Sequence, residues 1–228
     1  MSAIGVASLT RVKKPAQVLF AVIPLLFGIQ QCAEGMLWLT LKSGLHERLQ
    51  YAATYIFLVT ALVIWPTMIP LSARLMEKSK PRKKVLTGLM ITGAVLSLSY
   101  AFCLLFYDVT PQIHGFHIRY VDDFPGVFVK IAFVLYLAVT IVPFFISSVK
   151  RMWFFGVLIT ISCIITGIFF AQYLTSVWCF FAACISIVVF RILSGMKSET
   201  VQMPGRQQPW YERFKKEHRH PGEKFTTQ

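Results

Sequence analysis

The chain has 228 residues, of which 56% are hydrophobic and only 14% are charged, and its formal net charge is +13. Soluble domains usually carry about 25% charged residues, so this composition and the long apolar runs indicate an integral membrane protein. The lysines and arginines lie in the gaps between those runs rather than in one basic domain, and no nucleic-acid motif accompanies them. This distribution argues against nucleic-acid binding.

Six apolar runs are each long enough to cross the ~30 Å hydrocarbon core of a bilayer as a helix that rises ~1.5 Å per residue. They cover residues 18–41, 51–75, 85–106, 127–149, 153–172 and 174–193. We therefore expect an all-α fold, a polytopic transmembrane helix bundle over residues 1–193, followed by a basic tail over 194–228. Residues 1–10 are too short to span and are expected to be a half-helix, the end of a further helix.

Prolines interrupt three of these runs, and one of these prolines, Pro143, lies in the fourth. Pro24 lies in the first run, and Pro66 and Pro70 lie four residues apart in the second. Each proline lacks a backbone donor, so in a membrane the carbonyls it frees must be satisfied by neighbouring helices or line a cavity. A simple kink near the helix end is the alternative interpretation of the Pro66–Pro70 pair.

Charge predicts the orientation of the bundle. When the loops are assigned alternately to the two sides, one side receives all of the 23 lysines and arginines except Lys42, Arg48, Arg119 and Lys130. The basic side should be cytoplasmic and should carry the C-terminus, which places the 107–126 loop outside. The aromatic and basic residues of the tail predict either a disordered segment or a short helix on anionic lipid head groups.

The first span carries three polar side chains, Gln30, Gln31 and Glu34. An acidic residue near the middle of a span costs ~2.5–3.5 kcal/mol on insertion scales, so Glu34 should face other helices and have a partner. Lys130 also lies near the outer side and is a candidate partner. Two interpretations remain open: a small ligand or proton site, or polar contacts that hold helices together.

The long outer loop holds His114, His117, Asp122 and Asp123. Imidazole and carboxylate groups suit zinc, so this loop is a candidate metal site that could activate water for lipid hydrolysis. Otherwise these groups satisfy one another, and no cofactor is then expected. The five cysteines all lie in apolar runs and predict no disulfide, and the sequence contains no GxSxG, HExxH, Walker or GxGxxG motif.

Four strings resemble a bacterial multi-pass membrane family of unknown function: IPLLFGIQQCAEGMLWL, VIWPTMIPLSA, HGFHIRY and SVWCFFAACIS. The resemblance covers Gly5 to Phe190 and is carried best by the IPLLFGIQQ-x-x-EG-x-x-W run. It implies a bacterial inner-membrane location and seven spans, of which this chain holds only the end of the first, without the family's opening Met-Cys-Phe-Ser string. It implies no reaction, but it draws attention to Gln30, Gln31, Glu34, Trp38, Pro66, Pro70, His117, Tyr120, Trp178 and Cys179.

Three functional hypotheses follow. The first is a non-enzymatic membrane protein that acts as a sensor or a small-solute or proton carrier, with a polar site formed by Gln30, Gln31, Glu34, Trp38 and Lys130. The second is a metal-dependent lipid hydrolase that uses the loop histidines. The third is a structural or assembly subunit in which the polar residues only join helices.

Overall fold

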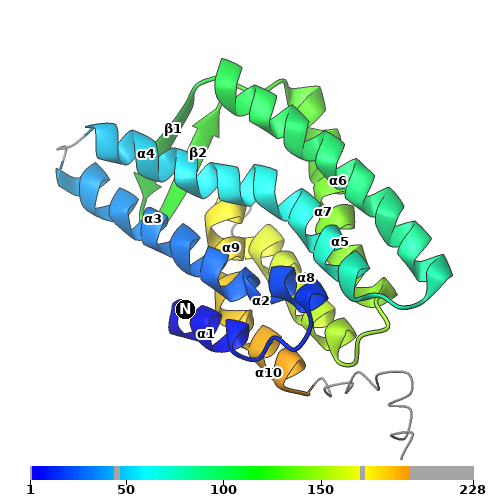
Figure 1. The fold of residues 1–228 in the computed structure, drawn as a ribbon. Helices are drawn as coiled ribbons and strands as arrows, with labels where there is room; N and C mark the ends of the chain where they lie inside the picture. Colours follow the sequence, from blue (N-terminus) through cyan, green and yellow to red (C-terminus); the bar gives the residue numbers. More distant parts are fainter. Residues whose placement is uncertain (1, 44–46, 170–172, 196–228) are drawn as a thin grey trace, which may run out of the picture. The chain divides into compact units, whose positions relative to one another are not determined.

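The computed structural model describes residues 2–43, 47–169 and 173–195 (Figure 1). Six helical stretches within these residues are long and apolar enough to cross a membrane, which confirms the all-α transmembrane bundle. They are Pro15–Lys42, Glu47–Met76, Lys80–Phe106, Gly126–Ile146, Met152–Phe169 and Thr175–Gly195. The predicted tail over 194–228 lies outside the described residues except for its first two positions.

Several spans are built from more than one element. The chain runs through α1 (Ser2–Leu9), a 3-10 turn (Pro15–Gln17), α2 (Val18–Ala21), α3 (Ile23–Ser43), α4 (Glu47–Leu58), a π-helical segment (Val59–Ile64), α5 (Trp65–Met76), α6 (Lys80–Phe106), β1 (Val109–His114), β2 (His117–Asp122), α7 (Gly126–Ile146), α8 (Met152–Phe169), α9 (Leu174–Ile185) and α10 (Ile187–Gly195). Pro24 stands at the second position of α3, just after the break between α2 and α3, where its missing N–H interrupts little. Helix α9 lies against both α3 and α8.

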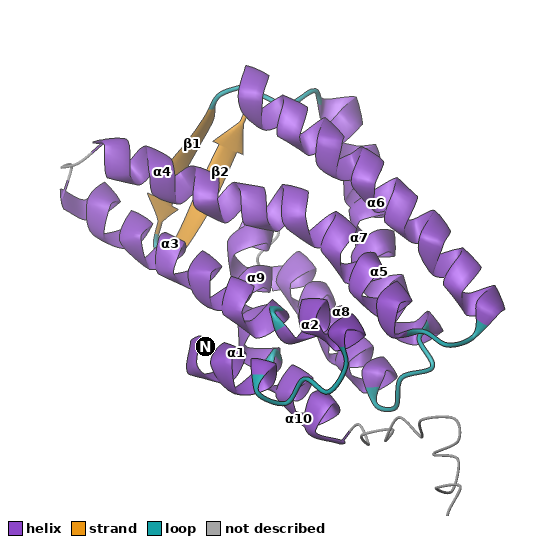
Figure 2. Ribbon diagram, in the orientation of Figure 1, coloured by secondary structure: helices purple, strands orange, loops and turns teal. Residues whose placement is uncertain are grey.

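The outer loop contains a hairpin that the sequence analysis did not predict. Strands β1 and β2 pair antiparallel, from Val109 opposite Asp122 to His114 opposite His117 (Figure 2). Gly115 opens the turn with a backbone φ of 61°, a conformation that residues other than glycine rarely adopt. The β-branched residues on both sides of this glycine were the available signal.

The two prolines of the second span force a π-helical segment between α4 and α5. The N–H of Trp65 donates to the carbonyl of Thr60, five residues earlier. In that register the next carbonyl, that of Ala61, would pair with residue 66, which is a proline and has no N–H. The hydroxyl of Tyr136 on α7 donates to the Ala61 carbonyl instead, at 2.7 Å. A neighbouring helix therefore satisfies the Ala61 carbonyl, which is one of the alternatives that the sequence analysis left open.

A glycine brings α6 against the same proline-containing segment. The hydroxyl of Ser97 donates to the Val63 carbonyl at 2.6 Å and lies 2.8 Å from the hydroxyl of Thr67. One turn earlier, a Cβ on Gly93 would lie only 2.0 Å from the carbonyl oxygen of Pro66. The close contact between α5 and α6 therefore depends on the absence of a side chain at this position.

Glu77 forms hydrogen bonds that connect the turn between α5 and α6 to the turn between α7 and α8. Its carboxylate accepts the N–H groups of Lys78 and Ser79 at 2.9 and 2.8 Å, and the N–H and hydroxyl of Ser148 at 2.7 and 2.6 Å. Burial alone would raise the pKa of Glu77, but these hydrogen bonds outweigh it and hold the pKa below its ordinary value. The sequence analysis assigned no role to Glu77.

Gly93→Ala should destabilise the bundle, since its methyl group would overlap the Pro66 carbonyl; a loss of about 1–3 kcal/mol in unfolding free energy is expected. The matched control is Gly88→Ala on the same helix, where an added Cβ meets nothing within 4 Å. That variant should be unchanged or slightly more stable, because alanine favours a helix over glycine. Unfolding in mild detergent measures both, and equal stability of the two variants would contradict the packing described.

Glu77→Gln should lower stability at neutral pH by about 2 kcal/mol, because hydrogen bonds to a charged group contribute about 1.5–3 kcal/mol each and the amide replaces them only in part. A lowered pKa means that the ionised carboxylate stabilises the folded state at neutral pH. This contribution is lost as the pH falls below about 4.3, the ordinary glutamate value, toward the folded-state pKa. The acid-induced fall of the unfolding midpoint should therefore be smaller in Glu77→Gln than in the wild type, whereas Glu47→Gln, at an exposed carboxylate, should behave like the wild type.

Candidate functional site

Gln30 occupies the centre of the helix crossing between α3, α5 and α9. Its side chain is fully buried; its carbonyl oxygen accepts the indole N–H of Trp65 at 3.1 Å, and its amide donates to the Cys179 sulfur at 3.2 Å. Both ends of the amide are therefore engaged with other helices. Of the predicted polar residues, Gln30 is the one whose geometry fits a structural contact between spans.

Glu34 lies one turn further along α3 and is buried, with 7% of its surface exposed. The hydroxyl of Ser176 on α9 donates to one carboxylate oxygen, and the amide of Gln31 donates to the other at 3.4 Å. Among the described residues, no lysine, arginine or histidine forms an ion pair with this carboxylate. Glu34 is thus a buried acid that has hydrogen-bond donors but no counter-charge.

A pocket of about 360 Å³ adjoins this carboxylate. It is lined by three elements, namely α3, the turn and start of β2, and α9. The lining residues are Gln31, Glu34, Gly35, Trp38, Phe116, His117, Ser176, Val177 and Phe180. Of the five residues of the predicted polar site, Gln31, Glu34 and Trp38 line this pocket, together with His117 from the outer hairpin and Ser176 from α9.

Lys130 does not join this pocket. It is exposed near the start of α7, and it makes no ion pair with Glu34 in the part of the chain that the structure describes. The ammonium group of Lys42 lies 5.5 Å from the centre of the Trp38 ring in the pocket wall. The predicted charge pairing is thus absent from this arrangement.

The four candidate metal ligands of the outer loop are also separated. His114 and His117 face each other beside the hairpin turn, but Asp122 lies at the far end of β2, five residues and roughly 17 Å away at 3.4 Å per residue. The described residues contain no group of three histidine, cysteine, aspartate or glutamate side chains placed to hold a metal ion. The two histidines instead flank the ring of Tyr173, with centroids 6.4 and 5.1 Å away.

A second, larger pocket of about 560 Å³ lies between the hairpin and helices α6 to α9. Tyr120, Trp178 and Cys179 all line it. The family resemblance had drawn attention to these residues, but sequence reasoning did not join them into a site. Burial and the charge of nearby Glu34 raise the pKa of Tyr120 well above its ordinary value, so its hydroxyl keeps its proton.

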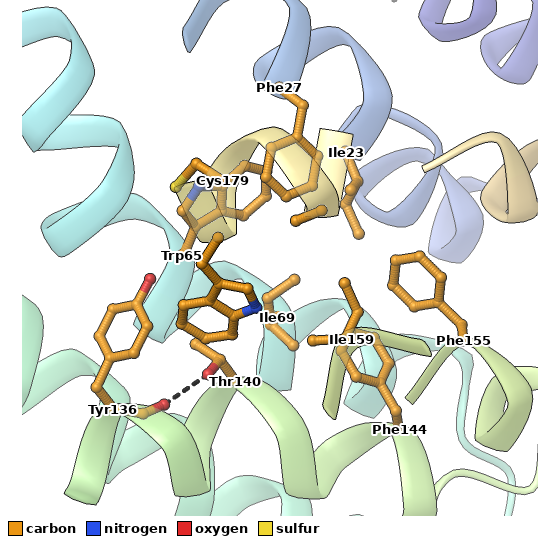
Figure 3. Close-up of a pocket in the computed structure, with 12 residues that line it drawn as sticks. Ile23, Phe27, Trp65, Ile69, Tyr136, Thr140, Phe144, Phe155, Ile159 and Cys179 are labelled. Atoms are coloured by element: carbon orange, nitrogen blue, oxygen red, sulfur yellow. Dashed lines mark hydrogen bonds between the residues drawn. The ribbon is translucent and has the colours of Figure 1, made fainter. Parts of the chain in front are cut away.

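Figure 3 shows a third, much smaller space in the bundle core, about 40 Å³ between α3, α5, α7, α8 and α9. Its walls are mainly apolar and aromatic side chains such as Phe27, Trp65 and Phe144. The hydroxyl of Thr140 already donates to the carbonyl of Tyr136 at 2.6 Å, which is the bond drawn in Figure 3. Thr140 therefore has no free hydroxyl hydrogen to offer a ligand in this space, which Trp178 also lines.

The fold and the pockets together define a helical membrane bundle with a polar pocket at Glu34. Residues 1–203 match a family described as "Family of unknown function (DUF6629)", and the chain belongs to that family. Neither a curated protein nor a solved structure matches the chain. The predicted membership of a family of unknown function is thereby confirmed, whereas the bacterial origin and the signature string stay predictions.

Gln30→Leu should cost about 1–3 kcal/mol of unfolding free energy, because it leaves the buried Trp65 indole N–H without an acceptor. Gln31→Leu is the matched comparison, since Gln31 is half-buried and makes one long hydrogen bond. It should cost less. Thermal unfolding in detergent measures both, and a larger loss for Gln31→Leu would contradict the structural role of Gln30.

Proposed function

We propose that this protein lies in a bacterial cytoplasmic membrane, binds a small cation or a proton at Glu34, and acts as a sensor or a small-solute carrier. The observation that carries the proposal is the buried Glu34 carboxylate, which borders a pocket and has no basic partner among the described residues. A carboxylate held between helices in a membrane is costly unless its charge is neutralised. Either a proton or a bound cation supplies that neutralisation.

The pocket walls favour an organic cation over a bare metal ion. Trp38, Phe116 and Phe180 line the same pocket as the carboxylate, and aromatic rings attract ammonium groups. A metal ion would need several oxygen or nitrogen ligands in place of these rings. The aromatic walls and the single acid are thus the combination that suits an alkylammonium group.

The approach to this pocket is from the predicted outer side. The hairpin that carries Phe116 and His117 connects α6 to α7, at the opposite end of these helices from the basic α5–α6 and α7–α8 turns. If the basic turns are cytoplasmic, the Glu34 pocket receives its ligand from outside the cell. A sensor would respond to that ligand, and a carrier would release it on the inner side.

Tetramethylammonium is the probe that we would use first. It should raise the unfolding midpoint of the purified wild type, since a ligand at 100 times its Kd stabilises the folded state by about 2.7 kcal/mol. Glu34→Gln should abolish the shift, whereas Glu47→Gln, which removes an exposed carboxylate, should retain it. Acidification should weaken binding, because one carboxylate accepts either the proton or the cation.

Infrared difference spectroscopy tests the proton directly. If Glu34 takes up a proton, the wild type should show a pH-dependent carboxylic-acid C=O band that Glu34→Gln lacks and Glu47→Gln keeps. The proposal fails if neither tetramethylammonium nor sodium shifts the midpoint and no such band depends on Glu34. Uptake of labelled tetramethylammonium into proteoliposomes then separates a carrier from a sensor.

A further inference from the structure

The larger pocket lies on the other face of α9 from Glu34, and two residues that line it carry buried polar groups without a hydrogen-bond partner in the described part of the chain. Among the described residues, only three buried side-chain groups lack a hydrogen-bond partner: the hydroxyl of Ser8, the hydroxyl of Tyr120 and the indole N–H of Trp178. Two of the three belong to residues that line this one pocket. Only 7% of the surface of Trp178 is exposed, so water does not readily replace the missing hydrogen-bond partner of its indole N–H.

Unpartnered polar groups are costly inside a membrane protein, and this bundle pairs comparable groups elsewhere. The indole of Trp65 reaches Gln30, and the hydroxyl of Tyr136 reaches a backbone carbonyl. Two unsatisfied donors beside the same cavity therefore point to a partner that enters from outside the protein.

The pocket reaches the surface that faces lipid. Val129 and Phe133 on α7 line it and are 38% and 36% exposed, on a helix whose outer face is apolar. Opposite them on α8, Gly167 lines the pocket, and an added Cβ there would meet nothing within 4 Å. The route into the pocket thus passes between apolar side chains.

The chemistry of the two donors defines the ligand. An indole N–H can only donate a hydrogen bond, so its partner must be an acceptor. The carboxylate of Asp122 in the pocket wall disfavours an anionic group. The volume of about 560 Å³ is that of an ordinary small-molecule site, within the range of roughly 300–1,000 Å³.

We propose that this pocket binds an uncharged, membrane-dissolved molecule whose carbonyl oxygen accepts hydrogen bonds from Tyr120 and Trp178 while its apolar chain lies between α7 and α8. The carbonyl can belong to the acyl ester of a phospholipid or to a free apolar carbonyl compound. The two sources present the same group to the protein. This site is independent of the cation proposed at Glu34.

A matched pair of probes tests the acceptor: 2-dodecanone and dodecane, which differ in the carbonyl. With the full chain in nanodiscs of diether phospholipid, which has no ester carbonyl, 2-dodecanone should raise the unfolding midpoint and dodecane should raise it much less. Equal shifts by the two probes would overturn the proposal. So would the absence of any shift with the ketone.

Variants separate the pocket from non-specific partitioning. Gly167→Leu should fill the open space and abolish the response to 2-dodecanone, whereas Gly88→Leu, at an equally open glycine on α6 that lines none of the pockets described, should retain it. Tyr120→Phe should weaken ketone binding about fivefold to tenfold, the effect of one neutral hydrogen bond. It should not destabilise the ligand-free protein, because it removes a hydroxyl that has no partner there. A full response in Gly167→Leu would overturn the proposal.

The source of the carbonyl follows from the bilayer. If a phospholipid ester is the natural occupant, the ketone shift should be present in diether nanodiscs and suppressed in diester nanodiscs. If the occupant is a free carbonyl compound, the shift should persist in both. Because none of these measurements involves Glu34 or tetramethylammonium, their outcome is separate from that of the cation site.

Discussion

The organisation of this bundle depends on one constraint: inside a membrane, each polar group must find its partner within the protein. The second span shows the constraint most clearly. Pro66 cannot donate to the Ala61 carbonyl, and Tyr136 of α7 supplies the missing hydrogen. Ser97 and Gly93 of α6 bring that helix against the same segment. A local defect in one helix thus fixes the positions of two others.

The position of helix α9 is the second consequence of this constraint. Cys179 receives the amide hydrogen of Gln30, and Ser176, about one turn earlier, donates to Glu34. Both contacts hold α9 against α3, on the side where the Glu34 pocket lies. Thr175, Trp178 and Cys179 line the larger pocket, so the first two turns of α9 form a wall between the two spaces. Neither pocket would have its present shape if α9 moved away from α3.

The sequence was sufficient for features that depend on local periodicity. The lengths of the apolar runs located the six spans, and the polar residues within the first run drew attention to Gln31 and Glu34, which line one pocket in the structure. Ser176 was beyond reach, because nothing local distinguishes a serine in an apolar run as the partner of an acid 142 residues away. Glu77 and the hairpin were missed for a different reason. A single acid in a basic turn and an alternating β-branched segment were both visible, but the sequence analysis assigned no role to the acid and treated the segment as part of the outer loop.

The polar groups of the bundle divide into those that packing satisfies and those that it leaves available. Gln30 uses both ends of its amide between helices, so a ligand there would have to break two existing contacts. Among the residues that the structure describes, Glu34 has no counter-charge, and the Tyr120 hydroxyl and the Trp178 indole N–H have no hydrogen-bond partner. Each buried group left without a partner costs about 1–3 kcal/mol, a substantial fraction of the stability of a folded domain. The side chains of Gln30, Tyr136 and Ser97 all form hydrogen bonds to other helices, so the missing partners of Glu34, Tyr120 and Trp178 are exceptions among the described residues of this bundle. Their position beside open volume, rather than in close-packed interior, is therefore the strongest physical reason to regard both faces of α9 as binding surfaces.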